Sequence, residues 1–438
     1  MGIKVLKFGG TSLANASQFR LVADIVRSDD SRRYVVASAP GKRFPNDTKV
    51  TDLLYKCYEL ASEELDFTEV FEEIKSRYID IINELGLDID LSESFEKIQN
   101  SFLHNSGRDY IASRGEYLNA KILACYLGYQ FIDAKKCIFF DDKGAFDAEK
   151  TNSVLKEYLN KYERAVIPGF YGSMPNGTIK TFSRGGSDIT GSIVARAASA
   201  TLYENWTDVS GFLMADPRCI KDPKVIKTIT YKELRELSYM GATVLHEDAI
   251  FPVRSAKIPI NIRNTNAPEE NGTYIVPETD EVPQYVITGI AGKTGFSTIT
   301  IEKDMMNSEF GFGRKVLQAI EENSISFEHF PSGIDTMSIV TSTSAIKEKR
   351  GEVMASICNA VNPDNIFTEE GLALIAIVGR GMVKAKGTAA RVFTSLAKSD
   401  INVRMIDQGS SELNIIVGVD ECDFTQALTA IYNEFVPD

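Results

Sequence analysis

Apolar residues recur in two alternating patterns over the first 283 positions of the chain. Short β-branched runs with the composition of buried strands lie at 3–6, 34–37, 165–168 and 258–262. Between them, apolar positions three or four residues apart predict helices at 16–26, 51–65, 67–85, 110–127 and 187–200. Strands that alternate with helices indicate an α/β fold with a largely parallel sheet. The polar segment 266–284 is interpreted as a linker that closes this region.

The remainder of the chain repeats one pattern. The first copy has strand 296–302, helix 311–323, strands 325–330 and 337–340, helix 347–361 and strand 366–368. The second copy has strand 372–378, helix 387–399, strands 402–406 and 413–419 and helix 424–435, and it stops before its last strand. A βαββαβ unit without that strand leaves a ladder unpaired. We expect the apolar stretch 285–290 to complete the second unit, so that the first unit is inserted within it.

The composition narrows the classes of function. Of the 438 residues, 43% are hydrophobic and 25% are charged, which is typical of a globular protein of two to four domains. A net charge of -13 argues against nucleic acid or an anionic membrane as partner. The six cysteines form no Cys-x-x-Cys pair, so we expect core thiols in a reducing compartment. No signal core or bilayer-spanning apolar run is found, and the sequence predicts a cytoplasmic protein.

Lys7-Phe8-Gly9-Gly10-Thr11-Ser12 follows the first predicted strand directly. The two glycines let backbone N–H groups approach a ligand, and the positive end of helix 16–26 would face the same point. Lys7 would add a full positive charge. These features suit a phosphate-binding turn, but a tight strand-to-helix connection with a surface lysine explains the glycines equally well.

A second glycine pair precedes the helix at 187–200, in Ser183-Arg184-Gly185-Gly186-Ser187-Asp188. Ser187 or Asp188 is a suitable N-cap for that helix. Arg184 is the residue type that grips a carboxylate with two parallel hydrogen bonds. Farther upstream, Glu116 lies within a helical stretch, where a lone glutamate ordinarily faces solvent.

These motifs, in this order, resemble those of the aspartokinases within the amino acid kinase family. The resemblance extends to Ser113-Arg114-Gly115-Glu116, to Trp206-Thr207-Asp208-Val209-Ser210-Gly211 and to the downstream Asp216-Pro217-Arg218. The repeat resembles tandem ACT domains, the ferredoxin-like sensors found behind aspartokinase catalytic domains. The resemblance implies an amino acid kinase-like αβα sandwich at 1–283 and ACT domains at 284–369 and 370–438.

The resemblance also implies a role for each matching residue. Lys7 and Asp188 would be catalytic, with Asp188 orienting Lys7 and the metal-bound phosphates. The nucleotide would be bound by Lys7, Gly9, Gly10, Thr11, Ser38, Thr207, Asp208 and Arg218. The substrate would be bound by Thr51, Glu116, Arg184 and Ser187. Of these, Arg184 would hold the α-carboxylate of aspartate and Glu116 its ammonium group. No residue is assigned as a metal ligand.

The implied reaction is the phosphorylation of L-aspartate on its side-chain carboxylate by ATP and Mg²⁺, the first step of lysine, threonine and methionine biosynthesis. That carboxylate has a reference pKa of about 3.9, so no general base is needed. Thr243 stands where aspartokinases carry a second phosphate-facing lysine, and Leu213 replaces a tyrosine of the nucleotide loop. Two alternatives stay open, another amino acid kinase such as a glutamate kinase and an ACT sensor that has lost turnover. His246 is interpreted as structural.

L-lysine is the implied effector, at the edge of the first ACT unit. Gly311 opens a helix whose N–H groups suit a carboxylate, and Glu328 with nearby strand carbonyls suits ammonium groups. The expected contact residues are Met306, Gly311, Phe312, Gly313, Ser326, Phe327, Glu328, Ser332 and Gly333. Because exposed sheet edges favour pairing between chains, we expect a homodimer or a dimer of dimers through the ACT domains.

Overall fold

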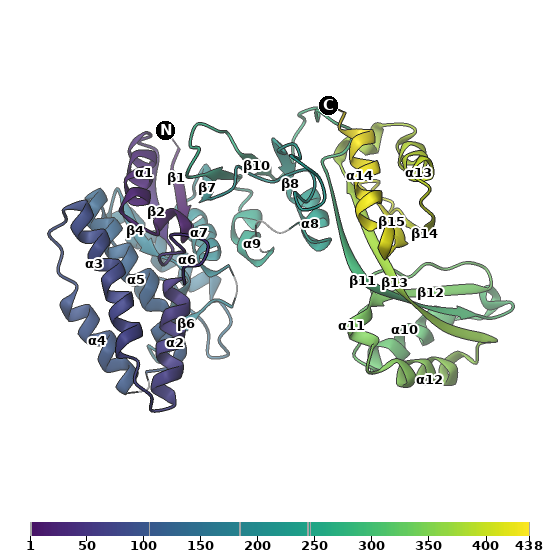
Figure 1. Ribbon diagram of the computed structural model, residues 1–438, viewed down its shortest axis with the longest axis horizontal. Helices are drawn as coiled ribbons and strands as arrows, with labels where there is room; N and C mark the ends of the chain where they lie inside the picture. The colour runs from purple at the N-terminus through teal and green to yellow at the C-terminus, as the bar shows by residue number, and fades with distance from the viewer. Residues whose placement is uncertain (1, 105, 184, 243–244, 246, 438) are drawn as a thin grey trace. The chain divides into compact units, whose positions relative to one another are not determined.

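The computed structural model describes residues 2–437 except 105, 184, 243, 244 and 246, and it divides the chain into two compact units (Figure 1). The first unit comprises Met1–Phe212, Val225–Lys232 and Thr243–Thr279. The second comprises Leu213–Lys224, Glu233–Ala242 and Asp280–Asp438. Among the described residues, no helix is both long and apolar enough to cross a membrane.

An eight-stranded sheet forms the centre of the first unit. Its strands lie in the order β3 (Gln130–Phe131), β4 (Ala165–Pro168), β2 (Arg32–Ala37), β1 (Lys4–Phe8), β7 (Leu202–Thr207), β9 (Ile260–Asn264), β10 (Thr273–Val276) and β8 (Thr228–Thr230). Every pair is parallel except β9 with β10. A separate hairpin is formed by β5 (Tyr171–Ser173) and β6 (Ile179–Thr181). The predicted α/β fold with a mainly parallel sheet is confirmed.

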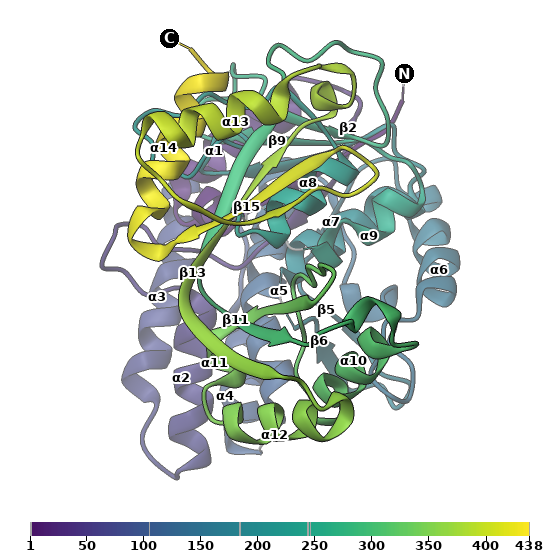
Figure 2. The ribbon, with the colours of Figure 1, turned by 90° about the vertical axis from the view of Figure 1, so that its right-hand side faces the viewer.

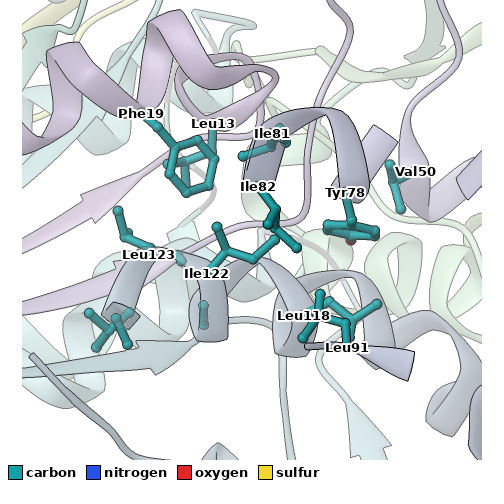
Figure 3. Close-up of a cluster of buried hydrophobic side chains, with 14 of the residues drawn as sticks. Leu13, Phe19, Val50, Tyr78, Ile81, Ile82, Leu91, Leu118, Ile122 and Leu123 are labelled. Carbon is teal, nitrogen blue, oxygen red and sulfur yellow. The ribbon is translucent and has the colours of Figure 1, made fainter. Parts of the chain in front are cut away.

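Helices pack on both faces of this sheet. One face carries α1 (Ala16–Arg27), α2 (Val50–Ser62), α3 (Thr68–Leu85), α4 (Ser92–Leu103) and α5 (Arg108–Leu127). The other carries α7 (Gly186–Ala197), against which α6 (Ala148–Lys161) and α9 (Glu247–Ser255) pack. Figure 3 shows Phe19 of α1, Ile82 of α3 and Ile122 of α5 converging in the buried cluster on the first face. Removing such side chains from water is the main driving force of folding.

The direction of each side chain on β1 follows from this core. Leu6 and Phe8 are fully buried in the cluster shared with α1 to α5. Because successive strand residues point to opposite faces, Lys7 must point to the α7 face. The burial of its two neighbours therefore determines where the ammonium group of Lys7 lies.

The second unit is built on a five-stranded antiparallel sheet. The strand order is β12 (Thr336–Ser342), β11 (Gly289–Glu302), β13 (Asn365–Val378), β15 (Asn414–Asp420) and β14 (Val403–Asp407). Its helices are α10 (Phe312–Glu322), α11 (Thr343–Ile346), α12 (Arg350–Val361), α13 (Thr388–Lys398) and α14 (Phe424–Phe435), and α8 (Tyr231–Tyr239) lies mostly in this unit. Figure 2 shows β13 as a long curved strand, with α13 and α14 at one end and α10 to α12 at the other.

Two continuous 14-residue strands, β11 and β13, join the two repeats. The first part of β11, Gly289 to Lys293, pairs with Leu374 to Val378, next to β15. A strand ahead of the first repeat thus pairs within the second, as the insertion hypothesis requires. The strand begins at Gly289, however, and not at residue 285. After a shift in the pairing register between Lys293 and Ser297, it continues as the first strand of the first repeat. The domain boundaries at 283 and 369 stay a prediction.

Three local predictions were wrong. The presumed linker 266–284 contains β10, whose Thr273 and Ile275 are fully buried; four strand residues are too few to stand out from polar flanks. Segment 325–330 forms only one isolated bridge to β12, from His329 to Val340, and Pro331 directly after it lacks the N–H that a continued ladder needs. Of the cysteines expected in the core, Cys125 and Cys422 are exposed.

Candidate functional site

Two adjoining cavities lie at the carboxyl ends of β1, β2 and β7. The larger, of about 340 Å³, is lined by Lys7, Gly9, Gly10, Thr11, Ser38, Ala39, Pro40, Gly41, Lys49, Thr51, Glu116, Ser187 and Thr207. The smaller, of about 230 Å³, is lined by Lys7, Ser38, Thr51, Glu116, Phe170, Gly185, Gly186, Ser187 and Asp188. The two share Lys7, Ser38, Thr51, Glu116 and Ser187. A shared wall of this kind suits two substrates that react with each other.

The Gly9-Gly10 turn forms one wall of the larger cavity. The N–H of Gly9 donates to the carbonyl of Trp206 at 3.0 Å, and the N–H of Gly41 donates to the carbonyl of Gly10 at 2.7 Å. A Cβ at Gly10 would lie 2.9 Å from the carbonyl oxygen of Ala39, and one at Gly41 would lie 2.5 Å from the carbonyl carbon of Gly10. Glycine is therefore required on both sides of this contact.

Helix α1 does not begin at the glycines. A 3₁₀ turn, Thr11–Leu13, intervenes, and α1 starts at Ala16. The side chain of Asn15 caps this helix by accepting the N–H of Gln18 at 3.0 Å. The sequence predicts that the positive end of α1 faces the ligand bound at the glycine turn. In the structure the turn itself, with Gly9, Gly10 and Thr11, lines the cavity instead.

Lys7, Asp188 and Asn205 form a connected chain of polar groups. Lys7 Nζ lies 2.7 Å from Asp188 Oδ1, and Asn205 Nδ2 donates to the same oxygen at 2.7 Å. Lys7 and Asn205 are register partners on the parallel strands β1 and β7, so their side chains lie on one face. Tyr203 Oη donates to the backbone carbonyl of Asp188 at 3.2 Å and fixes the first turn of α7. Three elements, β1, β7 and α7, therefore hold Lys7 in place.

The alternative assignment of Ser187 or Asp188 as an N-cap is wrong. The N-cap of α7 is Gly185, in the left-handed region with φ 57°, and no side chain caps the helix. Ser187 and Asp188 instead line the smaller cavity with Gly185 and Gly186. A carboxylate in the first turn of a helix is also stabilised by the helix dipole.

Glu116 is buried, with 5% of its surface exposed, so the expectation of a solvent-facing residue is wrong. Burial raises the pKa of Glu116 to about 8, although a hydrogen bond with the backbone of Ala39 opposes the shift. Its Oε2 atom has no hydrogen-bond partner among the described protein atoms. Glu116 lines both cavities, and a buried carboxylate oxygen without a partner is suited to binding a cationic group.

Helix α5 brings Glu116 to the cavities through a close contact. A Cβ at Gly115 would lie 2.8 Å from the Cβ of Ala39, so the glycine lets α5 approach the end of β2. Asn119 Nδ2 donates to the carbonyl of Ser38 at 2.7 Å and locks the same contact. Neighbouring Arg114 lies over the rings of Tyr110 and Tyr117 and serves the packing of α5.

A second buried network supports the turn from the opposite face of the sheet. Arg32 pairs with Glu204 through Nε at 3.0 Å and Nη2 at 3.2 Å. Glu204 also accepts the indole N–H of Trp206 at 2.9 Å. Since the carbonyl of Trp206 receives the N–H of Gly9, the network holds the strand end against which the glycine turn is built.

Other predicted site residues have different surroundings. Thr207 lines the larger cavity, whereas Asp208 is exposed and accepts the Thr207 hydroxyl at 3.2 Å. Arg218 belongs to the second unit, where it is ion-paired with Asp216 and its side chain is 85% exposed. Predictions for Arg184, Thr243 and His246 fall on residues outside the described part of the chain.

The predicted effector residues lie in the second unit. Gly311, with φ 75°, is the N-cap of α10, and Phe312 is buried. The N–H of Asn307 donates to the carbonyl of Ile334 at 3.2 Å, which joins the two segments expected to form the site. The Glu328 carboxylate already accepts a hydrogen bond from the Tyr239 hydroxyl, which raises the pKa of Tyr239 to about 12.

Sequence reasoning missed Asn205, Phe170, Lys49 and the segment 39–41. Asn205 could have been found from its position in the strand LYENWT, because a polar side chain on the buried face of a strand needs a hydrogen-bond partner. Phe170 and Lys49 lie in loops whose course is set by tertiary contacts. No local pattern identifies such residues.

Comparison with known proteins places the chain in a family. The model of the amino acid kinase family matches residues 2–264, and that of an ACT domain matches 375–435. Aspartokinase 3 of Bacillus subtilis is 41% identical, over 99% of this chain and 98% of that protein. The chain belongs to the aspartokinases of the amino acid kinase family.

Solved aspartokinase structures extend the likeness to three dimensions. Aspartate kinase of Clostridium acetobutylicum, described as an allosteric enzyme, is 51% identical with a TM-score of 0.89 and covers 99% of this chain and 100% of that one. Aspartokinase III of E. coli, solved with aspartate and ADP in an R-state, is 25% identical with a TM-score of 0.73 and covers 99% of both chains. The predicted family is thus confirmed for the whole length of the chain.

Proposed function

We propose that this aspartokinase transfers the terminal phosphoryl group of ATP to the side-chain carboxylate of L-aspartate, giving ADP and 4-phospho-L-aspartate. The observation that carries the proposal is the pair of adjoining cavities with Lys7 in their shared wall. The larger presents the backbone of the Gly9-Gly10 turn and hydroxyl groups, which suit phosphates. The smaller adds the N-terminus of α7 to the buried Glu116 carboxylate that lines both cavities, and these two groups suit the two charged ends of a zwitterion. The reaction would open lysine, threonine and methionine biosynthesis.

The larger cavity would take the nucleotide. Backbone groups of Gly9, Gly10 and Thr11 approach the phosphates, and Thr207 lies at the end of the neighbouring strand. Ser38 lines the larger cavity as well. We assign Asp208 and Arg218 to the nucleotide by their match to the family motifs alone. Lys7 faces both cavities and would neutralise charge on the phosphoryl group as it transfers.

The smaller cavity would take aspartate. Glu116 binds the ammonium group, and Arg184, by its place in the family motif, binds the α-carboxylate. Thr51 and Ser187 line the same space and offer hydroxyl groups. With both ends of the amino acid held, its side-chain carboxylate is directed to the shared wall and to the phosphate.

Catalysis then rests on position and charge. The reacting carboxylate is ionised at neutral pH, so the protein does not need to remove a proton. Holding two reactants in line can lower the barrier by about 7–11 kcal/mol. The Mg²⁺ ion would enter on the phosphates of the nucleotide, because this ion is usually bound by substrate phosphates and only one or two carboxylates. Asp188, which lines the smaller cavity beside Lys7, would orient Lys7 and the metal-bound phosphates.

Coupled detection of ADP release with aspartate, with glutamate and with neither amino acid tests the proposed reaction. We expect release with aspartate only, because glutamate is one methylene longer and cannot place its carboxylate at the same point while both ends are held. Release with glutamate would favour the glutamate kinase alternative. Absence of turnover with either amino acid would favour a sensor.

Replacing Glu116 by Gln should raise the KM for aspartate roughly tenfold to a hundredfold, as expected for loss of a hydrogen bond to a charged group, with little change in the KM for ATP. Free Glu116 is largely protonated below its pKa of about 8, whereas the ammonium group needs the carboxylate. The wild-type KM for aspartate should therefore fall as the pH is raised from 6 toward 8, and the variant should lose this dependence.

Steady-state kinetics over this pH range measure both effects. Glu59→Gln is the matched control, because Glu59 lies exposed on α2 and lines neither cavity. Equal increases in the KM values of aspartate and ATP would show that the ammonium site has been misplaced.

We also propose feedback inhibition by L-lysine at the edge of the first ACT unit. E. coli aspartokinase III, 26% identical with a TM-score of 0.71, has been solved with lysine and aspartate in a T-state. Here the helix N-terminus at Gly311 suits the effector carboxylate and Glu328 suits an ammonium group. Because Glu328 is hydrogen-bonded to Tyr239, lysine would have to displace that hydroxyl. Pairing of two ACT edges in a homodimer would complete the site.

Titration calorimetry with lysine should give saturable binding that weakens when aspartate and a non-hydrolysable ATP analogue are present, since linkage is reciprocal. Glu328→Gln should weaken lysine binding, whereas Glu352→Gln, an exposed substitution on α12, should not. If the substrates do not change the affinity for lysine, the proposed coupling is contradicted. If lysine does not bind at all, its assignment as the effector is contradicted.

A further inference from the structure

The larger cavity is lined by two lysines whose charges are compensated to different extents. Lys7 is 7% exposed and lies 2.7 Å from the carboxylate of Asp188. Lys49 is exposed and forms no ion pair with any residue in the described part of the chain. The pair of Lys7 and Asp188 adds little net charge to the cavity, so Lys49 is the lining residue that contributes an uncompensated positive charge there.

The backbone of Lys49 is held in place although its side chain is exposed. Arg77, which is 3% exposed, donates to the carbonyl of Thr48 at 2.6 Å and to that of Gly41 at 2.5 Å. These two residues lie near the ends of the loop between β2 and α2. The N–H of Val50, directly after Lys49, donates to the carbonyl of Pro40 at 3.2 Å. The loop therefore has fixed ends, and Lys49 stays at the cavity.

Asp47 reinforces the same arrangement from within the loop. It is 6% exposed and lies 3.5 Å from Arg77, and it binds the Arg43 side chain at 2.8 and 3.0 Å. The two arginines of this region are thus occupied by Asp47 and by loop carbonyls. Arg43 and Arg77 hold the loop, and the Lys49 ammonium group is left available to a ligand.

The position of Lys49 directly before α2 adds to its suitability for binding an anion. It is the N-cap of this 13-residue helix, so the positive end of the helix dipole lies beside it. On another wall of the same cavity lies the Gly9-Gly10 turn. An elongated polyanion that occupies the cavity would therefore lie between backbone N–H groups and a free ammonium group.

We propose that Lys49 binds the terminal phosphates of the nucleotide and supplies positive charge for phosphoryl transfer that the paired Lys7 does not supply alone. This inference rests on the proposed kinase function, because it assumes that the larger cavity takes ATP. It assigns a further nucleotide-binding residue to that site, in a loop separate from the Gly9-Gly10 turn.

Titration of the protein with AMP, ADP and the non-hydrolysable analogue AMP-PNP tests the assignment without turnover. Replacing Lys49 by Met should weaken AMP-PNP binding about tenfold, as expected for loss of a charge-assisted hydrogen bond at a partly solvated site, and should leave AMP binding unchanged. Lys49→Arg should retain most of the affinity because the charge is kept. The affinity of wild type for AMP-PNP should also fall more steeply with salt than that of Lys49→Met.

Lys56→Met is the matched control, since Lys56 is exposed on the same helix and does not line the cavity. Unchanged AMP-PNP affinity in Lys49→Met would overturn the assignment, and so would equal weakening of AMP and AMP-PNP, which indicates a change in pocket shape. Failure of wild type to bind any of the three nucleotides would instead reject the proposed kinase function.

Discussion

The ion pair between Lys7 and Asp188 is the interaction on which the rest of the site depends. It joins β1 to the first turn of α7, and Asn205 of β7 binds the same carboxylate oxygen. Its geometry follows from the core, because burial of Leu6 and Phe8 on one face of β1 sends Lys7 to the other. Loss of one partner from a largely buried ion pair costs about 3–5 kcal/mol, since the other charge is left uncompensated.

Two polar networks, one on each face of the sheet, meet at the ends of β1 and β7. On the α7 face, Asn205, Asp188 and Lys7 position the ammonium group. On the other face, Arg32 and Glu204 position Trp206, whose carbonyl receives the N–H of Gly9. The phosphate-facing lysine and the glycine turn thus have separate supports, although both belong to one short segment of the chain.

The sequence predicted those parts of the fold in which local pattern and tertiary packing agree. Strand–helix alternation located the strands β1, β2 and β4 and the helices α1, α2, α3, α5 and α7 within a few residues, because their apolar faces are also their buried faces. The pattern did not locate β10, since four strand residues in a polar segment carry little periodic signal. It also divided β11 and β13, because a glycine-containing irregularity resembles a turn when the neighbouring strand is unknown.

The candidate site was predictable to the extent that its residues lie in contiguous motifs. Lys7, Gly9, Gly10 and Asp188 could be named in this way. Burial of Glu116 could not be predicted, because it depends on the approach of α5 to the end of β2, which Gly115 permits. Asn205 and Lys49 become part of the site only through strand register and through loop anchoring, both of which are tertiary properties.

A double-mutant cycle on turnover, combining Lys7→Met with Asn205→Ala, tests most directly the claim that one polar chain sets the geometry of the site. If Asn205 acts through Asp188 on Lys7, Asn205→Ala alone should lower kcat by roughly one to two orders of magnitude at nearly constant KM, a loss typical of one buried hydrogen bond to a charged group. In the Lys7→Met background the same change should have almost no further effect. Independent, multiplicative losses from the two substitutions would contradict the account.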